Sequence, residues 1–328
     1  MRSVRAVGFL RYLIVAALAL LALPGTGACQ SNLTRTLMHD GVERTYQLHL
    51  PAAATGKLPL IVALHGIEQS IRQFKFWLPL DPVADRDGFA VAYPVAVDGR
   101  WSYGRPIIDP MPSKGGRPVD DVGFLRALVG TLVRERIADP ARIYVTGLSR
   151  GGLMSFTAAC SMSDLIAAVA PLITGMTEHQ RNDCRPQRLV PMMVLAGTND
   201  PVQVYDGWIE QQGRLLSVPE TMEFWRKLHG CKGQDERMLP HRDPADPTHV
   251  QVIDWLECRT GAPLRLYRVH GGGHRIPKLS EDRRQDEENG VRSRDLDTPA
   301  DRRLRSLAPA GPVRALPDGA GEASLARI

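Results

Sequence analysis

Short apolar runs alternate along the chain with segments of helical periodicity. Five runs have the length and composition of strands: residues 58–64 (LPLIVAL), 89–93 (FAVAY), 142–146 (RIYVT), 192–196 (MMVLA) and 264–269 (LRLYRV). Several of them are apolar at nearly every position, which is typical of parallel strands that are buried on both faces.

Two segments between these runs show the pattern of amphipathic helices. Residues 120–136 carry an apolar stripe of Val122, Leu125, Val129 and Leu132. Ser217 and Glu220 have the spacing of a capping box and open a second helix, which ends at Gly230. The alternation predicts an α/β fold with a mostly parallel central sheet and helices on both faces. Ligands of such sheets bind beyond the carboxyl ends of the strands.

The two ends of the chain do not fit this pattern. Three arginines precede the apolar run 12–23, and small residues follow at 25–28, so we expect residues 1–28 to be a secretory signal peptide. After Tyr267 the sequence has no aromatic residue and becomes rich in charge, Ala, Gly and Pro. We therefore predict a disordered or divergent tail at 278–328. Residues 29–277 are long enough for one domain with a substantial core, and we expect them to form the catalytic domain.

Net charge and cysteine content indicate which partners and which cellular compartment to expect. Three units of the formal net charge of +5 come from arginines in the predicted signal peptide, so the charge gives no reason to expect a nucleic-acid partner. An exported chain is extracellular or periplasmic, where disulfides form. Cys29 stands at the predicted cleavage point, where a lipid-modified cysteine would attach the protein to a membrane. Plain secretion and lipid anchoring are both kept as hypotheses.

The other four cysteines allow three pairings. We predict Cys160–Cys184, which would fasten a polar loop to the helix after residue 149, and Cys231–Cys258, which would close a polar loop rich in proline. Each bridge would close about 25 residues. Four buried free thiols are the alternative.

A serine follows the run 142–146 directly, in the sequence Gly147-Leu148-Ser149-Arg150-Gly151, and a plausible helix comes next. This strand–turn–helix setting is the one in which a Gly-x-Ser-x-Gly turn exposes a nucleophilic hydroxyl above a sheet. The alternative is an N-capping serine in a glycine-rich connection.

A serine hydroxyl needs a base, and the base needs an orienting acid. Asp200 follows the run 192–196, and His274 follows the run 264–269. The chain order Ser149, Asp200, His274 is the order used by α/β-hydrolases. Each residue has an alternative interpretation. Asp200 would be a turn former before Pro201, and His274 would bind a metal ion together with His270. The glycines at 271–273 argue against the helix that a pair at i, i+4 would need.

Two backbone N–H groups are candidates for an oxyanion hole. One belongs to Arg150, directly after the serine, and the other to Ile67, in the loop after the run 58–64. Each donor of this kind contributes about 3 kcal/mol to transition-state binding.

With these residues in place, the chain resembles the esterase/polyhydroxybutyrate depolymerase family of α/β-hydrolases, which includes feruloyl and acetylxylan esterases. The resemblance covers residues 32–274 and is carried by LPLIVALHG (58–66), ADRDGFAVAYP (84–94), DDVGFLRALV (120–129), DPARIYVTGLSRGG (139–152), GTNDPVQVYDG (197–207), HGC (229–231) and GGGH (271–274). It implies the α/β-hydrolase fold and a triad of Ser149, Asp200 and His274. Arg150 departs from the small or amide residue that is more usual in the family.

The expected function is that of an exported serine esterase that works through an acyl-enzyme. Its substrate would be a small-molecule or polymeric ester, and no metal or organic cofactor is implied. A serine peptidase of the same fold and a non-catalytic surface lipoprotein are the alternatives. Aromatic residues beside the predicted site are candidates for substrate contact or for ordinary packing: Trp101, Tyr103, Tyr205 and Trp208.

Overall fold

The computed structural model describes residues 31–52, 55–103, 113–114, 117–210, 213–241, 244–259 and 261–276. The predicted signal peptide, Cys29 and the predicted tail lie outside these residues. None of the described helices is long and apolar enough to span a membrane.

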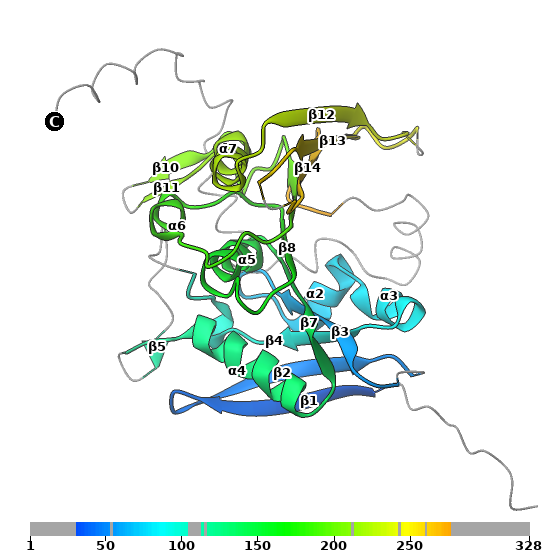
Figure 1. Ribbon diagram of the computed structural model, residues 1–328, viewed down its shortest axis with the longest axis vertical. Helices are drawn as coiled ribbons and strands as arrows, with labels where there is room; N and C mark the ends of the chain where they lie inside the picture. Colours follow the sequence, from blue (N-terminus) through cyan, green and yellow to red (C-terminus); the bar gives the residue numbers. More distant parts are fainter. Residues whose placement is uncertain are drawn as a thin grey trace, which may run out of the picture.

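Ten strands in the described part of the chain form one continuous sheet (Figure 1). In sheet order they are β1 (Ser31–His39), β2 (Val42–Leu50), β4 (Ala90–Pro94), β3 (Leu58–Leu64), β7 (Ala138–Leu148), β8 (Ala168–Leu172), β9 (Met192–Gly197), β14 (Leu264–His270), β13 (His249–Leu256) and β12 (Gly233–Met238). The six central strands from β4 to β14 are mutually parallel, whereas the two strands at each edge pair antiparallel. The carboxyl ends of the central strands therefore meet at one edge of the sheet, which is where the candidate site lies.

Helices cover both faces of the sheet, as predicted. Figure 1 shows α4 (Asp121–Arg134), α5 (Arg150–Ser161), α6 (Glu178–Asp183) and α7 (Val218–His229) on one side. The short helices α2 (Ile71–Trp77) and α3 (Leu80–Asp87) lie on the other side. A large apolar cluster fills the space under α4, α5 and α7, and a smaller one lies under α2 and α3. The prediction of an α/β fold is confirmed.

The helices begin and end where their capping residues stand. Ser217 and Glu220 form the predicted capping box of α7, and Gly230 ends that helix in the left-handed conformation with φ of 64°. Asp120 caps α4 by accepting a hydrogen bond from the Gly123 N–H. Local side-chain chemistry thus decides these boundaries, while the buried stripe of each helix decides which side faces the sheet.

The remaining described elements are short. They are a 3₁₀ turn η2 (Val97–Gly99), the hairpin of β5 (Ser113–Lys114) with β6 (Arg117–Pro118), and the hairpin of β10 (Trp208–Glu210) with β11 (Gly213–Leu215).

Two segments expected to be polar loops have regular structure instead. The segment between Cys231 and Cys258 forms the hairpin of β12 and β13, and Cys184 follows directly after α6. Strand β12 has the sequence GQDERM and lies at the sheet edge with mostly exposed residues. It therefore lacks the apolar alternation by which strands are recognised, and its partner β13 supplies the register.

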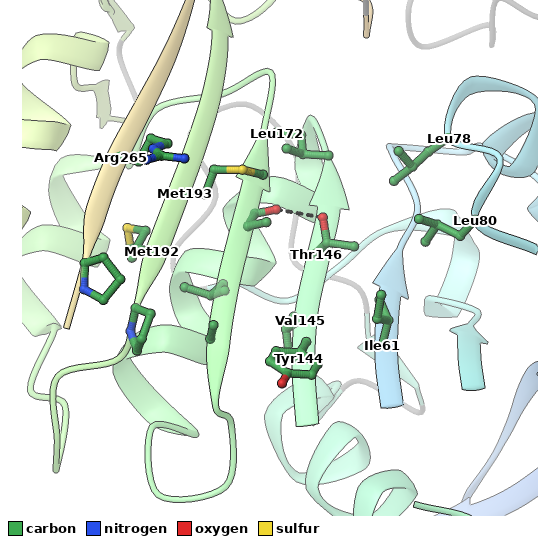
Figure 2. A pocket seen from close by; sticks show the side chains of 15 residues that line it. Ile61, Leu78, Leu80, Tyr144, Val145, Thr146, Leu172, Met192, Met193 and Arg265 are labelled. Atoms are coloured by element: carbon green, nitrogen blue, oxygen red, sulfur yellow. Dashed lines mark hydrogen bonds between the residues drawn. The ribbon is translucent and has the colours of Figure 1, made fainter. Parts of the chain in front are cut away.

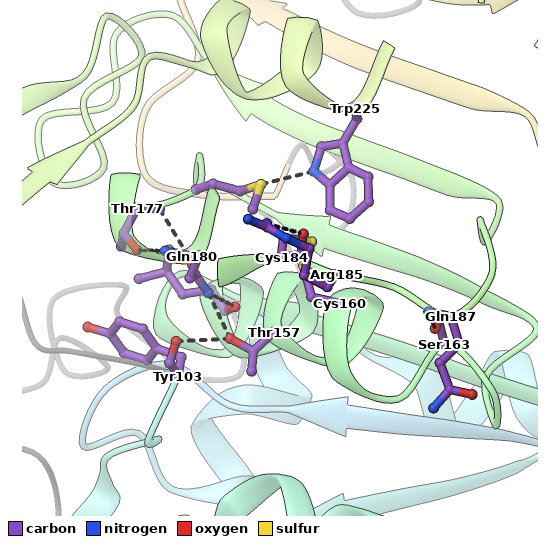
Figure 3. The surroundings of a disulfide bond; sticks show 12 residues. Tyr103, Thr157, Cys160, Ser163, Thr177, Gln180, Cys184, Arg185, Gln187 and Trp225 are labelled. Carbon is purple, nitrogen blue, oxygen red and sulfur yellow. Dashed lines mark hydrogen bonds between the residues drawn. A yellow bond between two sulfur atoms is a disulfide. The ribbon is translucent and has the colours of Figure 1, made fainter. Parts of the chain in front are cut away.

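Both predicted disulfides are present, Cys160–Cys184 and Cys231–Cys258. The first joins the end of α5 to the residue after α6 (Figure 3). Beside it, the Gln180 side chain of α6 donates hydrogen bonds to the Leu153 carbonyl at 2.6 Å and to Thr157 Oγ1 at 2.8 Å, both on α5. The bridge and the amide together attach α6 to the helix that follows Ser149.

Replacing both Cys231 and Cys258 by serine should lower the free energy of unfolding by about 3 kcal/mol, because the bridge restricts the unfolded chain over a separation of 27 residues. Urea denaturation of the oxidised proteins measures the change. The double variant Cys160→Ser/Cys184→Ser, with a separation of 24 residues, should lose a similar amount. Equal stability of the Cys231/Cys258 variant and the unaltered protein would contradict the expectation.

Candidate active site

Ser149 stands in a strained turn between β7 and α5. Its backbone has φ of 54° and ψ of −114°, a conformation that non-glycine residues rarely adopt. The Ser149 N–H donates to the Leu172 carbonyl at 3.0 Å, and α5 begins at the next residue. The turn therefore places the serine at the carboxyl end of β7 and at the amino end of a helix, where the helix dipole favours negative charge.

Gly151 allows α5 to approach the sheet closely enough for this turn. A Cβ atom at that position would lie 2.1 Å from the Leu64 carbonyl oxygen and 2.7 Å from the His65 carbonyl oxygen. Any other residue would force the backbone of α5 or β3 to shift. The second glycine of the Gly-x-Ser-x-Gly sequence is thus required by packing against β3.

Asp200 and His274 are hydrogen-bonded to each other. Nδ1 of His274 lies 2.7 Å from Oδ2 of Asp200, and the Asp200 side chain is only 1% exposed. The other carboxylate oxygen accepts the backbone N–H groups of Val202 and Gln203, each at 2.8 Å. These bonds fix the carboxylate so that Oδ2 is directed to the imidazole, which leaves Nε2 of the ring for another partner.

The loop that carries His274 lies across the end of β9. The Asn199 N–H donates to the Gly272 carbonyl at 2.8 Å, and the Gly271 N–H donates to Thr198 Oγ1 at 2.9 Å. A Cβ atom at Gly197 would lie 2.3 Å from the Gly272 carbonyl oxygen. Because β9 lies between β14 and the strand pair β7–β8, this contact directs the histidine loop toward the serine.

The metal alternative for the two histidines does not match these contacts. His274 is bonded to Asp200, whereas His270 Nε2 lies 2.9 Å from Oε1 of Gln251 on the neighbouring strand β13. The two imidazoles thus have different partners. The alternative role of Asp200 as a turn former is also present, because its side chain accepts the N–H groups of Val202 and Gln203. The same side chain is hydrogen-bonded to the His274 imidazole.

The loop after β3 passes beside the serine. A Cβ atom built on Gly66 would lie 3.8 Å from Ser149 Cβ. Ile67 is 3% exposed, and among the described residues its N–H has no acceptor within hydrogen-bonding distance. A backbone N–H of a buried residue that has no acceptor among the described residues, beside a candidate nucleophile, fits the predicted role of an oxyanion donor.

His65, which the sequence analysis left without a role, holds this loop. Its Nδ1 lies 2.6 Å from the Gly66 carbonyl, and its Nε2 accepts the Ala96 N–H at 3.0 Å. The ring is therefore neutral with the proton on Nδ1. Trp101 adds a third restraint by donating its indole N–H to the His65 carbonyl at 2.8 Å. Burial lowers the pKa of His65 to about 4.

This lowered pKa gives the protein an acid-sensitive component of stability. In the unfolded chain the His65 pKa returns to about 6.5, so the unfolded state takes up a proton first as pH falls. The contribution is complete above pH 6.5 and is lost as pH falls from 6.5 to 4. That difference in pKa corresponds to about 3 kcal/mol of unfolding free energy.

Urea denaturation at pH 7 and pH 4 should therefore show a smaller loss of stability for His65→Gln than for the unaltered protein. His179→Gln is the matched control, because His179 lies at the surface on α6. The expectation is wrong if both variants lose as much stability between the two pH values as the unaltered protein does.

The four aromatic candidates for substrate contact differ in exposure. Trp101, Tyr103 and Tyr205 are 2%, 4% and 7% exposed and belong to the large apolar cluster, and Trp208 is half-buried against it. The Tyr103 hydroxyl accepts a hydrogen bond from the Arg150 guanidinium. The Tyr205 hydroxyl accepts one from Arg268 Nε at 2.7 Å. Packing accounts for the first three, and substrate contact by any of the four stays a prediction.

The chain is similar in sequence to known esterases. Residues 44–211 match the family model described as esterase PHB depolymerase. Feruloyl esterase B of Piromyces equi is 29% identical over 237 residues, which cover 68% of this chain and 41% of that protein. The putative esterase NocK of Nocardia uniformis subsp. tsuyamanensis is 30% identical over 265 residues, 75% of this chain and 74% of that protein. The chain thus spans less than half of the first relative and about three quarters of the second.

A third relative is poly(3-hydroxyalkanoate) depolymerase C of Paucimonas lemoignei, 30% identical over 136 residues, which cover 39% of this chain and 30% of that protein. Among solved structures, an acetyl xylan esterase from Aspergillus awamori superposes with a TM-score of 0.52 at 15% identity, and covers 79% of this chain and 100% of that one. At this identity the likeness concerns the fold.

Proposed function

The chain belongs to the esterase/polyhydroxybutyrate depolymerase family, and from this membership we propose that it hydrolyses carboxylic esters through a covalent acyl-enzyme. The observation that carries the proposal is the 2.7 Å hydrogen bond between Asp200 and His274 at the sheet edge where Ser149 stands in its strained turn. An imidazole held in this way by a buried carboxylate is the arrangement that activates a serine.

In the first half of the reaction, Ser149 Oγ attacks the ester carbonyl and its proton passes to Nε2 of His274. The carbonyl oxygen becomes an oxyanion, which the N–H groups of Ile67 and Arg150 would bind. When the tetrahedral intermediate collapses, the bond to the alcohol breaks, and the alcohol leaves with the proton from His274. An acyl group then remains on the serine.

In the second half, water attacks the acyl carbonyl while His274 takes its proton. Collapse of the second intermediate returns that proton to Ser149, and the carboxylic acid leaves. Asp200 keeps the proton of the neutral ring on Nδ1 and stabilises the imidazolium that forms in each half. The chain's own residues supply every proton transfer.

We also propose that the mature enzyme begins near Cys29 and works outside the cytoplasm, with a catalytic domain of residues 29–277. The two disulfides support an oxidising compartment. The names of the relatives favour feruloyl, acetylated-sugar or hydroxyalkanoate esters as substrates, whether small or polymeric.

A fluorophosphonate probe and a substrate panel test the proposal. The probe should label Ser149, as located by peptide mass spectrometry, and the mature protein should hydrolyse at least one of feruloyl, acetyl-sugar, short-chain aryl and hydroxybutyrate esters. The matching amides should react far more slowly. Faster cleavage of amides would identify a peptidase, and the absence of both labelling and hydrolysis would identify a non-catalytic protein.

A further inference from the structure

A buried ion pair joins β2 to α4. Arg44 Nη2 donates to Oδ1 of Asp121 at 2.5 Å, and the two side chains are 1% and 0% exposed. The Arg44 guanidinium also lies over the Phe124 ring, 4.0 Å from its centroid. Burial removes both charges from water, and apolar residues of similar volume are often at least as stabilising as such a pair. The pair therefore calls for an explanation other than stability.

Polar groups elsewhere in the sheet need no such pair. The groove beside α2 and α3, on the other face of the sheet, has a mainly apolar lining (Figure 2). The Thr146 hydroxyl in this groove donates to the Ala170 carbonyl of the neighbouring strand at 2.8 Å. A bond between adjacent strands is enough to satisfy that hydroxyl. The ion pair differs because it also bonds to a loop near the candidate active site.

This loop is the segment after β4, residues 95–103, which we call the β4 loop. Arg44 Nη2 donates to the Val95 carbonyl at 3.4 Å, and the Ser102 N–H donates to Oδ2 of Asp121 at 2.6 Å. Each carboxylate oxygen of Asp121 thus has its own partner, the guanidinium for Oδ1 and the loop for Oδ2. The ion pair therefore fixes the β4 loop at both ends.

The middle of the β4 loop holds the residues on both sides of Ile67, whose N–H is a proposed oxyanion donor. Two N–H groups of the loop bond to His65. The Glu68 N–H donates to the Gly99 carbonyl at 2.8 Å, and Arg100 Nη2 donates to Glu68 Oε1 at 2.7 Å. Four hydrogen bonds from one loop thus fix the backbone before and after Ile67.

The contact with the β4 loop holds Glu68 in a strained conformation. Its φ is 51°, in the left-handed region that non-glycine residues rarely adopt. A Cβ atom at Gly99 would lie 2.9 Å from Glu68 Cα, so the two segments approach closely at this point. Strain of this kind persists only where surrounding contacts impose it, and it is concentrated at functional sites.

The end of the β4 loop contacts α5, which carries the second proposed donor at its first residue, Arg150. The Tyr103 hydroxyl accepts a hydrogen bond from the Arg150 guanidinium. The Tyr103 carbonyl accepts one from Thr157 Oγ1, two turns further along the helix, at 3.0 Å. The β4 loop therefore contacts both segments that carry the proposed oxyanion donors.

We propose that Arg44 and Asp121 are positioning residues for the oxyanion hole and act on it through the β4 loop. This inference rests on the proposed esterase function. The oxyanion exists only in the transition state and the tetrahedral intermediate, so misplaced donors weaken the binding of these species and leave the binding of the substrate unchanged. The expected signature is a fall in kcat at constant KM.

Two double variants test the proposal. Arg44→Met/Asp121→Ala removes both charges, which leaves no unpaired buried charge, and it also removes the acceptor of the Ser102 N–H. Its kcat on the best ester of the panel should fall by about 100-fold with KM within about twofold of the unaltered value. Arg44→Met/Asp121→Asn keeps an oxygen that can accept the Ser102 N–H, so its kcat should be at least about tenfold higher than that of the alanine variant.

Asp120→Ala is the matched control. Asp120 precedes Asp121 in the chain, but it is exposed and caps α4 by accepting the Gly123 N–H. Loss of this cap should lower Tm by about 3 °C and leave both kcat and KM unchanged. This variant separates a weaker α4 from a displaced β4 loop.

Trp101→Phe tests the next step of the same chain of contacts. It removes the indole donor to the His65 carbonyl and keeps an aromatic ring in the core. Its kcat should fall by about tenfold at unchanged KM, because the segment before Ile67 loses one of its restraints. A rise in KM instead would mean that Trp101 contacts the substrate, and it would overturn the proposal.

The proposal is also overturned if the folded alanine double variant keeps its kcat, if the two double variants lose kcat equally, or if Asp120→Ala loses as much as the alanine variant. Far-UV circular dichroism checks the fold of each variant. If the alanine double variant does not fold, Trp101→Phe decides, and full kcat of that variant overturns the proposal. Absence of ester hydrolysis by the unaltered protein would refute the esterase function itself, whereas full activity of the variants would refute only the positioning role.

Discussion

Replacement of Ser149 by alanine is expected to lower ester hydrolysis by about 10⁴-fold or more, because no other group in the proposed mechanism can form the acyl-enzyme. The fold should remain, since the position needs only a small side chain in a strained turn with φ of 54°. Stability should rise slightly or stay unchanged, as expected when a catalytic residue is relieved of a functional constraint. Steady-state hydrolysis of the best ester in the panel measures the loss, and far-UV circular dichroism with urea denaturation checks the fold.

Ser161→Ala is the matched control for this variant. Ser161 is the last residue of α5, the helix that begins after Ser149, and it is exposed. The Ser161→Ala variant should retain full activity and react with the fluorophosphonate probe, whereas the Ser149→Ala variant should not react. Full activity of a well-folded Ser149→Ala protein would disprove the acyl-enzyme mechanism proposed for this chain.

The parts of the site that could be predicted from sequence are those whose position follows from strand order. Ser149, Asp200 and His274 follow the strands β7, β9 and β14 within one to four residues. Parallel strands bring their carboxyl ends to one edge, so the sequence predicts that the three residues lie near one another, and the structure pairs two of them, Asp200 and His274. The disulfides were predictable for a different reason. Setting aside Cys29 left four cysteines, and the pairing was chosen so that each bridge would fasten a polar loop.

The parts that could not be predicted depend on contacts between distant segments. The role of His65 depends on the Ala96 N–H and the Trp101 indole, which belong to the loop after β4. A single histidine after an apolar strand gives no sign of such partners. Likewise β12 is polar along its length and is a strand only because β13 pairs with it.

The burial of the aromatic residues near the site could not be predicted from sequence either. The sequence places Trp101 and Tyr103 in a loop near the site, which suits either a substrate cleft or the core. The structure buries both, and the hydrogen bond between Tyr103 and Arg150 connects this loop to the residue after the serine. Such a contact between residues 47 positions apart has no local signature in the sequence.

Replacement of Asp200 by asparagine is expected to lower turnover at neutral pH by about 10⁴-fold with little change in the fold. An amide fits the space of the carboxylate, and its oxygen can still accept the N–H groups of Val202 and Gln203, which now bind Oδ1. The amide nitrogen would then face His274 Nδ1 in place of Oδ2. Because that nitrogen is a donor, the ring would carry its proton on Nε2, and Nε2 could no longer accept the serine proton.

Asp206→Asn is the matched control, since Asp206 lies in the same loop but is exposed. The two variants should have similar urea denaturation curves at neutral pH, and only the Asp200 variant should lose turnover. Hydrolysis measured from pH 6 to 9 adds a second reading: hydroxide can remove the serine proton when the imidazole cannot, so the residual activity of Asp200→Asn should rise with pH. Turnover of Asp200→Asn equal to that of the unaltered protein would mean that another carboxylate orients His274, and the hydrogen bond at 2.7 Å would then have only a structural role.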